Sequence, residues 1–565
     1  MSTDGGPNAI LDPTGRSRSA RSTVELAARR VDLRGARVGL LENTKHNADL
    51  FLDELGRLLL DEHEAAALFR RTKTAFALPV SEAELADIAA HCDVVITGVG
   101  DCGSCSASAV ADGVAFERHG IPAAVICSDA YRVTADAMAE HAGMPGYRYV
   151  TTPHPVAVLT PEEVRERARQ CLNDVLTLLT SAADLPTAPQ GTVTQPSHNQ
   201  RDNRTMRRNA TTAVNPGEAE LWGWSDGLPV VPVSAPLLAE FLATTRRDPG
   251  EVIGRMPQLD RDCTVELAAI NAAMAGCRPE YFPVVLAAFE ALMRDRTTRG
   301  GGWQSTSGPA PLIVVNGPVR TELGFNSAGG VFGPGFRPNA TVARAIGLIV
   351  RNAFGVLPQV FEQATQGVPG RWSICLAENE EESPWEPLSI DGGLPAGTSA
   401  VSAMLTRTCE FVDNRHTSDP EQLLADFADT ISRSGALIFR HTSCGVVFGP
   451  EHAQLLADAG YTKADVRAWL VEHCGRSTAD LRRAGKDGVG ENGVRYPART
   501  PDVNGFQRIL PDPANVPVLV AGARNAAMSM VVRVFGVWSG VSVAVEGSSD
   551  GRPGRAAGAT VGAVG

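Results

Sequence analysis

The sequence predicts an α/β protein of two units, a doubly wound parallel sheet followed by a larger mixed α/β unit. Over residues 23–180, short apolar runs alternate with segments of helical periodicity, which is the pattern of βαβ units. Residues 181–216 lack this periodicity and are rich in Thr, Pro, Asn and Gln, as expected of a linker. The second unit, 217–546, is expected to bind the substrate. A disordered leader is predicted over 1–22 and a flexible tail over 547–565.

The first unit is expected to form a parallel sheet of the flavodoxin or Rossmann kind. Its predicted strands are 37–42, 75–78, 93–97, 122–127 and 156–159, and its predicted helices are 47–60, 81–91, 106–119, 131–143 and 161–180. Asn47 stands where its side chain could cap the first helix. Ligands of doubly wound sheets bind beyond the carboxyl ends of the strands, so the loops after 37–42 and 93–97 are the places to search for a site.

The second unit combines strands and helices without a simple alternation, which indicates a mixed α/β fold. Its predicted helices are 263–277, 282–296, 340–353, 420–434 and a pair within 450–474, and its predicted strands are 311–315, 436–439, 445–448 and 518–522.

Composition limits the classes of function. The 565 residues are 43% apolar and 21% charged, with a formal net charge of −12 and no sustained basic face, so nucleic acid is not an expected partner. No apolar run approaches the ~18 residues of a membrane helix, and the N-terminus has no hydrophobic signal segment. Eleven cysteines in this length indicate mostly free thiols, typical of the cytoplasm. We expect a cytoplasmic protein with no membrane partner and leave a homo-oligomer open.

One motif carries chemistry. Directly after predicted strand 93–97 stands Gly98-Val-Gly-Asp-Cys102-Gly-Ser-Cys105-Ser106, followed by a helix. The positive end of a helix stabilises a thiolate, and a second thiol three residues on can resolve a mixed disulfide. Half of a zinc site is the structural alternative, but it needs two further ligands, and the chain has no second CxxC and no HxxxH. No metal is therefore expected.

Two further groups of residues belong to the same predicted edge. Asp101 and Lys45 join the two cysteines as catalytic candidates, because a lysine near a thiol favours its ionised form. Taken alone, Lys45 is more simply interpreted as a solvated lysine beside a helix cap. Asn43, Asn47 and Ser106 are substrate-binding candidates, since amides and hydroxyls can hydrogen-bond a carbonyl or carboxylate. Cys127 and His154 are weaker candidates from neighbouring loops.

Asn43-Thr-Lys-His-Asn-Ala48, followed about fifty residues later by the motif around Cys102, resembles the UGSC (seleno)protein family. The resemblance covers about residues 31–180. It implies that Cys102 corresponds to the family's selenocysteine or cysteine position and that Cys105 is its partner. Because selenium is used where an ionised nucleophile is needed, the resemblance also implies that Cys102 is the attacking group. The second unit resembles an uncharacterised domain associated with such proteins, which implies no residue roles.

The second unit offers two weaker candidate sites. A loop rich in glycine and asparagine over 323–341 runs into a helix, so Asn326, Arg337 and Asn339 could bind an anion. Glu378 and Asn379 open an acidic run that could bind a cation or supply a general base, although such runs are more often solvated loops. His441 with Cys444 is a further pair that sequence proximity supports only weakly.

These observations favour a thiol-dependent oxidoreductase that acts on a small, anionic organic substrate, with Cys102 attacking and Cys105 resolving. No bound cofactor is expected, but an external thiol reductant would restore the pair. One alternative is a lyase or sulfurtransferase in which Cys102 forms an adduct or persulfide and Cys105 only tunes it. Another is a thiol or metal sensor module that regulates the second unit.

Overall fold

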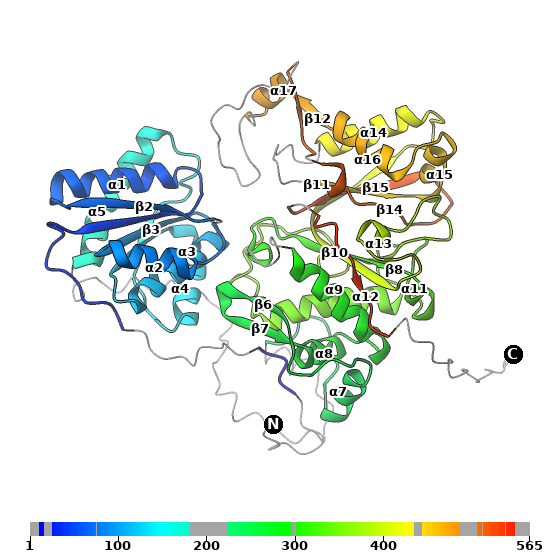
Figure 1. The fold of residues 1–565 in the computed structure, drawn as a ribbon, viewed down its shortest axis with the longest axis horizontal. Helices are drawn as coiled ribbons and strands as arrows, with labels where there is room; N and C mark the ends of the chain where they lie inside the picture. The colour runs from blue at the N-terminus through cyan, green and yellow to red at the C-terminus, as the bar shows by residue number, and fades with distance from the viewer. Residues whose placement is uncertain are drawn as a thin grey trace.

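The protein is described from a computed structural model (Figure 1). It describes residues 11–15, 25–74, 76–180, 223–295, 298, 301–433, 443–485, 505–510, 512–536 and 538–547. The predicted linker 181–216, the predicted strand 436–439 and His441 lie outside these residues, as does almost all of the predicted tail. None of the helices in the described part combines the length and apolar character needed to cross a bilayer.

The first unit contains a five-stranded sheet whose strands are all parallel, in the order β2-β1-β3-β4-β5. The strands are β1 Arg37–Glu42, β2 Ala67–Thr72, β3 Val94–Gly100, β4 Ala123–Ser128 and β5 Val150–Thr152. This order is that of flavodoxin-like doubly wound sheets, so the predicted fold class is confirmed. Its switch point, where the winding direction reverses, lies between β1 and β3.

Helices cover both faces of this sheet. They are α1 Ala48–His63, α2 Glu82–His91, α3 Gly103–Arg118, α4 Arg132–His141 and α5 Pro161–Thr180. Figure 1 shows α1 and α5 on one face and α2, α3 and α4 on the other. The α1 and α5 face is sealed by side chains such as Phe51, Leu55 and Val175, all buried against β1, β3 and β4.

Two predicted strands of the first unit are wrong, and both concern sheet edges. The second strand is Ala67–Thr72 rather than 75–78, and its largely solvent-facing side chains hid it from a search for apolar runs. The last strand is Val150–Thr152, whereas Val156–Leu159 form a turn. Asn47 does precede α1, but its side chain makes no cap. Instead it donates to Val156 O and Leu159 O, both at 3.0 Å.

The second unit is built on a seven-stranded mixed sheet in the order β14-β11-β15-β10-β8-β9, with β16 paired to β10. Its strands are β8 Ala310–Asn316, β9 Cys375–Ala377, β10 Ala400–Asp413, β11 Ser443–Phe448, β14 Val518–Val520, β15 Met528–Val534 and β16 Val543–Ala544. The two edges meet where Asn379 N donates to Val520 O at 2.8 Å. One face of the sheet therefore encloses its own core, which includes Leu312, Leu376 and Leu519.

The outer face of this sheet has two helical coverings. The β8 and β10 half packs on α8 Val265–Met274, α9 Phe282–Arg294 and α12 Arg337–Leu348. The β11 and β14 half packs on α14 Pro420–Arg433, α15 Pro450–Asp458 and α16 Lys463–His473. Outside these layers lie α7 Ala235–Leu242 and the hairpin of β6 Val252–Met256 and β7 Arg261–Thr264. The predicted mixed α/β class is confirmed.

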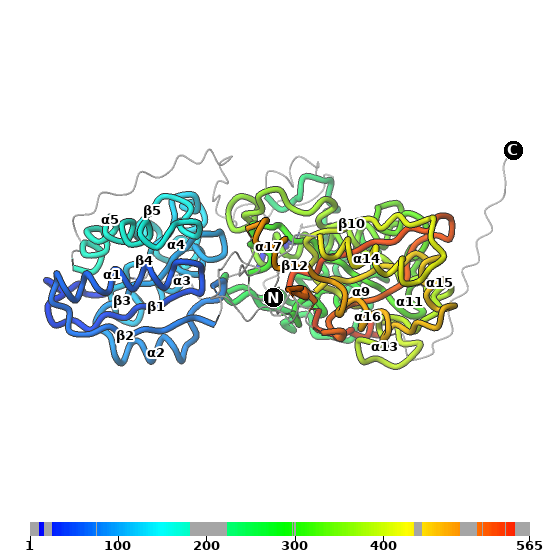
Figure 2. The backbone as a smooth tube through the Cα atoms, turned by 90° about the horizontal axis from the view of Figure 1, so that it is seen from above, coloured from blue at the N-terminus to red at the C-terminus, as the bar shows by residue number. Residues whose placement is uncertain are grey.

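The two units lie side by side and touch through α3 and α4 (Figure 2). Apolar side chains of these helices join the core of the second unit. Thr134 Oγ1 donates to Val360 O at 3.0 Å, and His141 Nε2 is hydrogen-bonded to Leu259 O.

A short N-terminal segment also reaches the second unit. Within the predicted leader, residues 11–15 are held by bonds from Leu11 N to Val233 O and from Asn271 Nδ2 to Pro13 O. Arg261 Nη1 donates to Gly15 O at 2.9 Å. This part of the leader is packed against the second unit rather than loose.

Candidate active site at the cysteine pair

The cysteine pair lies at the switch point of the first sheet. Cys102 comes two residues after β3, and the loop 43–47 follows the neighbouring β1. Because all five strands are parallel, the loops after β2, β4 and β5 open at the same edge. This is the position at which flavodoxin-like sheets bind their ligands.

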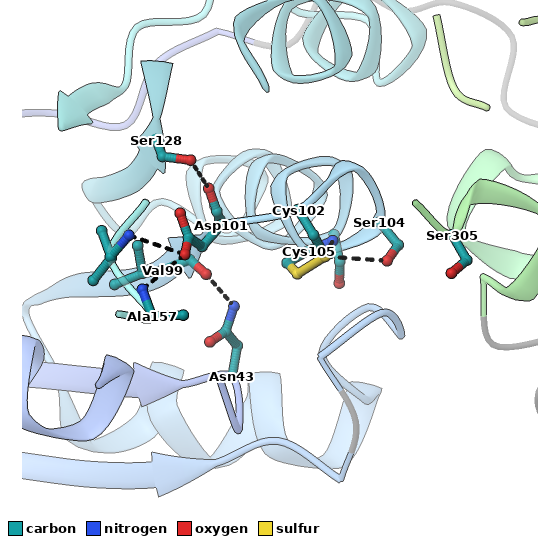
Figure 3. Close-up of a disulfide and its surroundings, with 12 residues drawn as sticks. Asn43, Val99, Asp101, Cys102, Ser104, Cys105, Ser128, Ala157 and Ser305 are labelled. Atoms are coloured by element: carbon teal, nitrogen blue, oxygen red, sulfur yellow. Dashed lines mark hydrogen bonds between the residues drawn. A yellow bond between two sulfur atoms is a disulfide. The ribbon is translucent and has the colours of Figure 1, made fainter. Parts of the chain in front are cut away.

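Cys102 is the N-cap residue of α3. Its backbone is extended, and its sulfur accepts a hydrogen bond from Cys105 N at 3.3 Å, while Ser104 Oγ lies 3.5 Å away. Cys102 and Cys105 form a disulfide in this structure (Figure 3). In the reduced pair, a thiolate on Cys102 would face the free N–H groups and the positive end of a 16-residue helix. The helix begins at Gly103, three residues before the predicted start, which brings both sulfurs to its first turn.

The two sulfurs differ in accessibility. Cys105 is fully buried, whereas Cys102 is partly exposed. The nine other cysteines are free thiols, and burial raises the pKa of most of them. The pKa rises to about 11 for Cys92, Cys171 and Cys409 and to about 12 for Cys127 and Cys277, and it is also raised for Cys263, Cys375 and Cys474. Cys102 therefore has the best placed sulfur for nucleophilic attack.

Asp101 organises the loop beside the pair. Its carboxylate accepts bonds from Val156 N at 3.0 Å and Ala157 N at 2.9 Å, and it lies 2.9 Å from His154 Nδ1. Figure 3 shows this carboxylate turned toward Ala157 and away from the disulfide. Ser128 Oγ, 3.1 Å from His154 Nδ1, completes the contact between the loops after β3, β4 and β5. Asp101 thus fixes the loop from which Cys102 projects.

Lys45 is the titratable group of the neighbouring loop. Its ammonium lies over the ring of Phe76, 4.4 Å from the centroid. Burial lowers the pKa of Lys45 to about 8, and the negative charge of Asp101 opposes this shift. An amine with this pKa can both give and take a proton near neutral pH.

The three polar substrate-binding candidates of this unit are used by the protein itself. Asn43 Nδ2 donates to Val99 O at 2.9 Å, and its Oδ1 is buried without a partner. Asn47 holds the turn 156–159, as described above. Ser106 is buried beside Cys127, where its hydroxyl opposes the rise in the Cys127 pKa. All three lie at or just beyond the carboxyl ends of β1 and β3, and Figure 3 shows the Asn43 amide pointing toward Val99.

The first unit matches a known protein family. The model of the UGSC family matches residues 9–181. The N-terminal part of the chain is a UGSC family domain. The match extends the resemblance seen at 31–180 and includes residues 11–15, which bind the second unit. No curated protein matches the chain.

The second unit contributes residues to the UGSC domain's cysteine loop that sequence reasoning missed. A Cβ on Gly103 would lie 2.6 Å from Gln363 Cγ and 3.4 Å from Gln304 O, and one on Gly301 would lie 3.4 Å from Ser104 Cβ. Figure 3 shows Ser305 opposite Ser104. Both residues between the cysteines therefore touch the second unit. No local pattern marks Gln304 or Gln363, because the contact spans more than 190 residues of sequence.

The candidates predicted in the second unit lie elsewhere. The two segments that contact the cysteine loop, around residues 301–305 and around Gln363, precede the parallel strands β8 and β9, whereas the loop 323–341 follows β8. A seven-residue strand separates its ends by roughly 20 Å. Arg337 Nε donates to Gly276 O, and Asn339 bonds Asn326 and Cys375 O. The structure does not bring these residues to the sulfur pair.

Glu378 and Asn379 lie at that distant end as well. Glu378 is fully buried, and burial raises its pKa although the Lys463 charge opposes the shift. Its carboxylate accepts from Asn316 Nδ2 at 2.7 Å and Leu388 N at 2.8 Å. Asn379 Nδ2 donates to Gly522 O at 3.1 Å. Both side chains hold strand ends together.

Arg320 pairs with the next two carboxylates of the acidic run, and Arg524 pairs with Glu382. The buried guanidinium of Arg320 contacts Glu380 and Glu381 at 3.0 Å and also donates to Glu378 O at 2.8 Å. Within the residues that the structure describes, no group of three or more His, Cys, Asp or Glu side chains is arranged to hold a metal ion.

Proposed function

We propose that this protein is a thiol-dependent enzyme in which Cys102 and Cys105 carry out redox chemistry on a small organic substrate. The supporting observation is the difference between the sulfurs: Cys102 is partly exposed and caps α3, whereas Cys105 is sealed behind it. An accessible attacking thiol with a less accessible resolving thiol suits thiol–disulfide exchange, because the rate depends on which sulfur the substrate can reach.

The exchange runs in two balanced steps. The Cys102 thiolate attacks one sulfur of an oxidised substrate disulfide, the substrate S–S bond breaks, and the released thiolate takes up a proton. The Cys105 thiol then loses its proton and attacks the Cys102 sulfur, which expels the second substrate thiol and leaves the 102–105 disulfide. Two equivalents of a monothiol reductant such as glutathione reduce this disulfide again. A cytoplasmic location would supply that reductant and keep the buried thiols reduced.

Lys45 supports the proton transfers of this scheme. Its pKa of about 8 suits a donor to the departing thiolate. The glycine-rich loop with Arg337 has no part in the proposal, since it lies at the far end of β8. The anionic character of the substrate accordingly loses the support that this loop had provided.

Matched single variants test the proposal with glutathione disulfide as the oxidised probe. We expect Cys105→Ser to accumulate a mixed disulfide at Cys102, because no resolving thiol remains. Cys102→Ser should form one at Cys105 at least about a hundredfold more slowly, since Cys105 is buried and lacks the cap position. Peptide mass spectrometry locates the adduct. Equal rates at the two sulfurs, or labelling of Cys102 no faster than of the nine other thiols, would refute the proposal.

A sulfur-transfer or C–S lyase reaction is the second candidate. It is favoured by the same Lys45, which can protonate a carbon or sulfur leaving group while Cys102 holds the adduct. Mass spectrometry after incubation with a candidate substrate separates the two functions. A persulfide or substrate adduct on Cys102 supports this reaction, and an intramolecular 102–105 disulfide supports the redox one.

A further inference from the structure

The second unit covers the cysteine loop so closely that a residue larger than glycine at its centre would have to displace a neighbouring side chain. Any side chain at 103 would collide with Gln363 Cγ and Cβ, at 2.6 and 2.7 Å from an added Cβ. On the other side, Gly301 approaches Ala77 and Ser104. The first turn of α3 is therefore in contact with two separate segments of the second unit, around residues 301–305 and around Gln363.

Gln304 stands out in this contact because its amide has nothing to bond. The side chain is 1% exposed, yet neither Nε2 nor Oε1 has a hydrogen-bond partner. A buried polar group without a partner destabilises a fold unless water or a ligand satisfies it. The Gln304 backbone oxygen lies directly against the position of a Gly103 Cβ.

The surroundings of Gln304 contain further unpartnered donors. The neighbouring Trp303 is fully buried, and its indole N–H has no partner. Its ring stacks on Trp372 at 5.2 Å, and Arg371 donates to Trp303 O at 3.4 Å while its own Nε stays unpartnered. Arg371 is paired with Glu362 at 3.0 Å, so the net charge of this pair is zero. Free donors without net charge suit a neutral carbonyl compound better than a strong anion.

We propose that Gln304 is a substrate-binding residue supplied by the second unit, and that it recognises a carboxamide or similar carbonyl group on the molecule that Cys102 attacks. A side-chain amide matches such a group because each carries a donor beside an acceptor. This inference rests on the proposed function, since it requires Cys102 to be the nucleophile. It makes the active site composite, with sulfur from one unit and recognition from the other.

Two alkylating probes test the inference in a Cys105→Ser background, where Cys102 stays free. Iodoacetamide carries the carboxamide, whereas iodoacetonitrile alkylates by the same displacement of iodide but has no amide. We expect Gln304→Met, which keeps the side-chain volume, to slow the reaction of Cys102 with iodoacetamide about fivefold, the effect of one lost hydrogen bond. The rate with iodoacetonitrile should change less than about twofold. Gln304→Glu should give an intermediate loss, because it keeps an acceptor without the donor. Gln170→Ala, an exposed glutamine on α5, is the control and should change neither rate.

The outcomes separate this inference from the proposed function. Two outcomes would overturn the inference alone. One is fast alkylation of Cys102 with the same ratio of the iodoacetamide rate to the iodoacetonitrile rate whether residue 304 is Gln or Met. The other is a crystal structure in which ordered waters satisfy the Gln304 amide while a carboxamide probe is bound elsewhere. Slow alkylation of Cys102 by both probes, comparable to that of the buried thiols, would overturn the proposed function and the inference together. If Gln304→Met does not fold, the Gln304→Glu rate ratio decides in its place, and an unchanged ratio there counts against the inference.

Discussion

The two sheets of this protein use their strand ends in opposite ways. At the carboxyl ends of β1 and β3, the UGSC domain carries a partly exposed sulfur at a helix N-terminus and, in the loop after β1, a lysine with a lowered pKa. At the carboxyl ends of β8 and β9, the second unit gathers more charge, but the four carboxylates of the run 378–382 each have an internal partner, with Arg320 contacting two of them. This difference is why we place the proposed chemistry at the sulfur pair: the Cys102 sulfur is accessible, whereas the denser charges of the second unit are already paired.

The largest expected effect concerns Arg320, at the carboxyl ends of β8 and β9 of the second unit. Arg320→Met leaves Glu380, Glu381 and the Glu378 carbonyl without their common partner, so we expect the free energy of unfolding to fall by about 3–5 kcal/mol. Urea denaturation measures this loss, and the glutathione reaction of Cys102 should not change. The control is Arg415→Met, which removes an ion pair with Asp413. Both side chains of this pair are about half exposed, so we expect the free energy of unfolding to fall by less than about 1 kcal/mol. Equal losses for the two variants would show that the network is not structural.

A smaller effect concerns Lys45, in the loop after β1 of the UGSC domain, and depends on pH. The pKa of Lys45 is near 8 in the folded protein against 10.5 for an ordinary lysine. Between these values the unfolded chain holds a proton that the folded one has released, so the stability contributed by Lys45 increases as pH rises through this window. Relative to Lys45→Met, the wild type should gain about 2 kcal/mol between pH 7.5 and pH 10, after allowance for partial exposure. Denaturation curves at both pH values measure the gain. A constant difference between the two proteins would contradict the burial of this ammonium.

The smallest effect tests the contact between the units. Gly103→Ala should destabilise the protein by about 1 kcal/mol because the new methyl group meets Gln363. Gln363→Gly removes both the Cβ and the Cγ that the new methyl group meets, so the double variant should recover most of the loss. Urea denaturation of the four proteins gives the coupling energy, and additive effects would mean that the two residues do not touch.

The sequence was sufficient for the parts of the fold that have a local cause. The βαβ alternation and the helix that begins near Cys102 follow from short-range apolar periodicity. The same periodicity places the cysteine motif directly between a strand and that helix. The edge strands β2 and β5 were misplaced because edges need no continuous apolar run. β10 and β15 were not predicted at all. In β10 the apolar run is broken by Ser402 and Thr406, which are buried because they bond to Ser542 and Ala310 O.

The candidate site also has one part that the sequence predicts and another part that it does not. Cys102, Cys105, Lys45 and Asn43 follow β1 and β3, so the parallel sheet brings them to one edge, as predicted. In the sequence, the acidic run and the glycine-rich loop resembled binding sites. In the structure, Arg320 pairs with the acidic run and Asn339 of the loop bonds Cys375 O, and these long-range partners could not be identified from the sequence. The approach of Gln304 and Gln363 to Gly103 could not be predicted, since it joins two separately folded layers.

The segment 11–15 gives the chain an unusual route. It is bound to the second unit, the chain then forms the five-stranded sheet and helices of the UGSC domain, and after residue 180 it returns to the second unit. The two units are thus tethered at both ends of the UGSC domain, which raises the effective concentration of one for the other. A fragment that begins after residue 15 would keep one tether only. It would lose part of the entropic advantage that holds Gly103 against Gln363, even though no residue of the sulfur site had been removed.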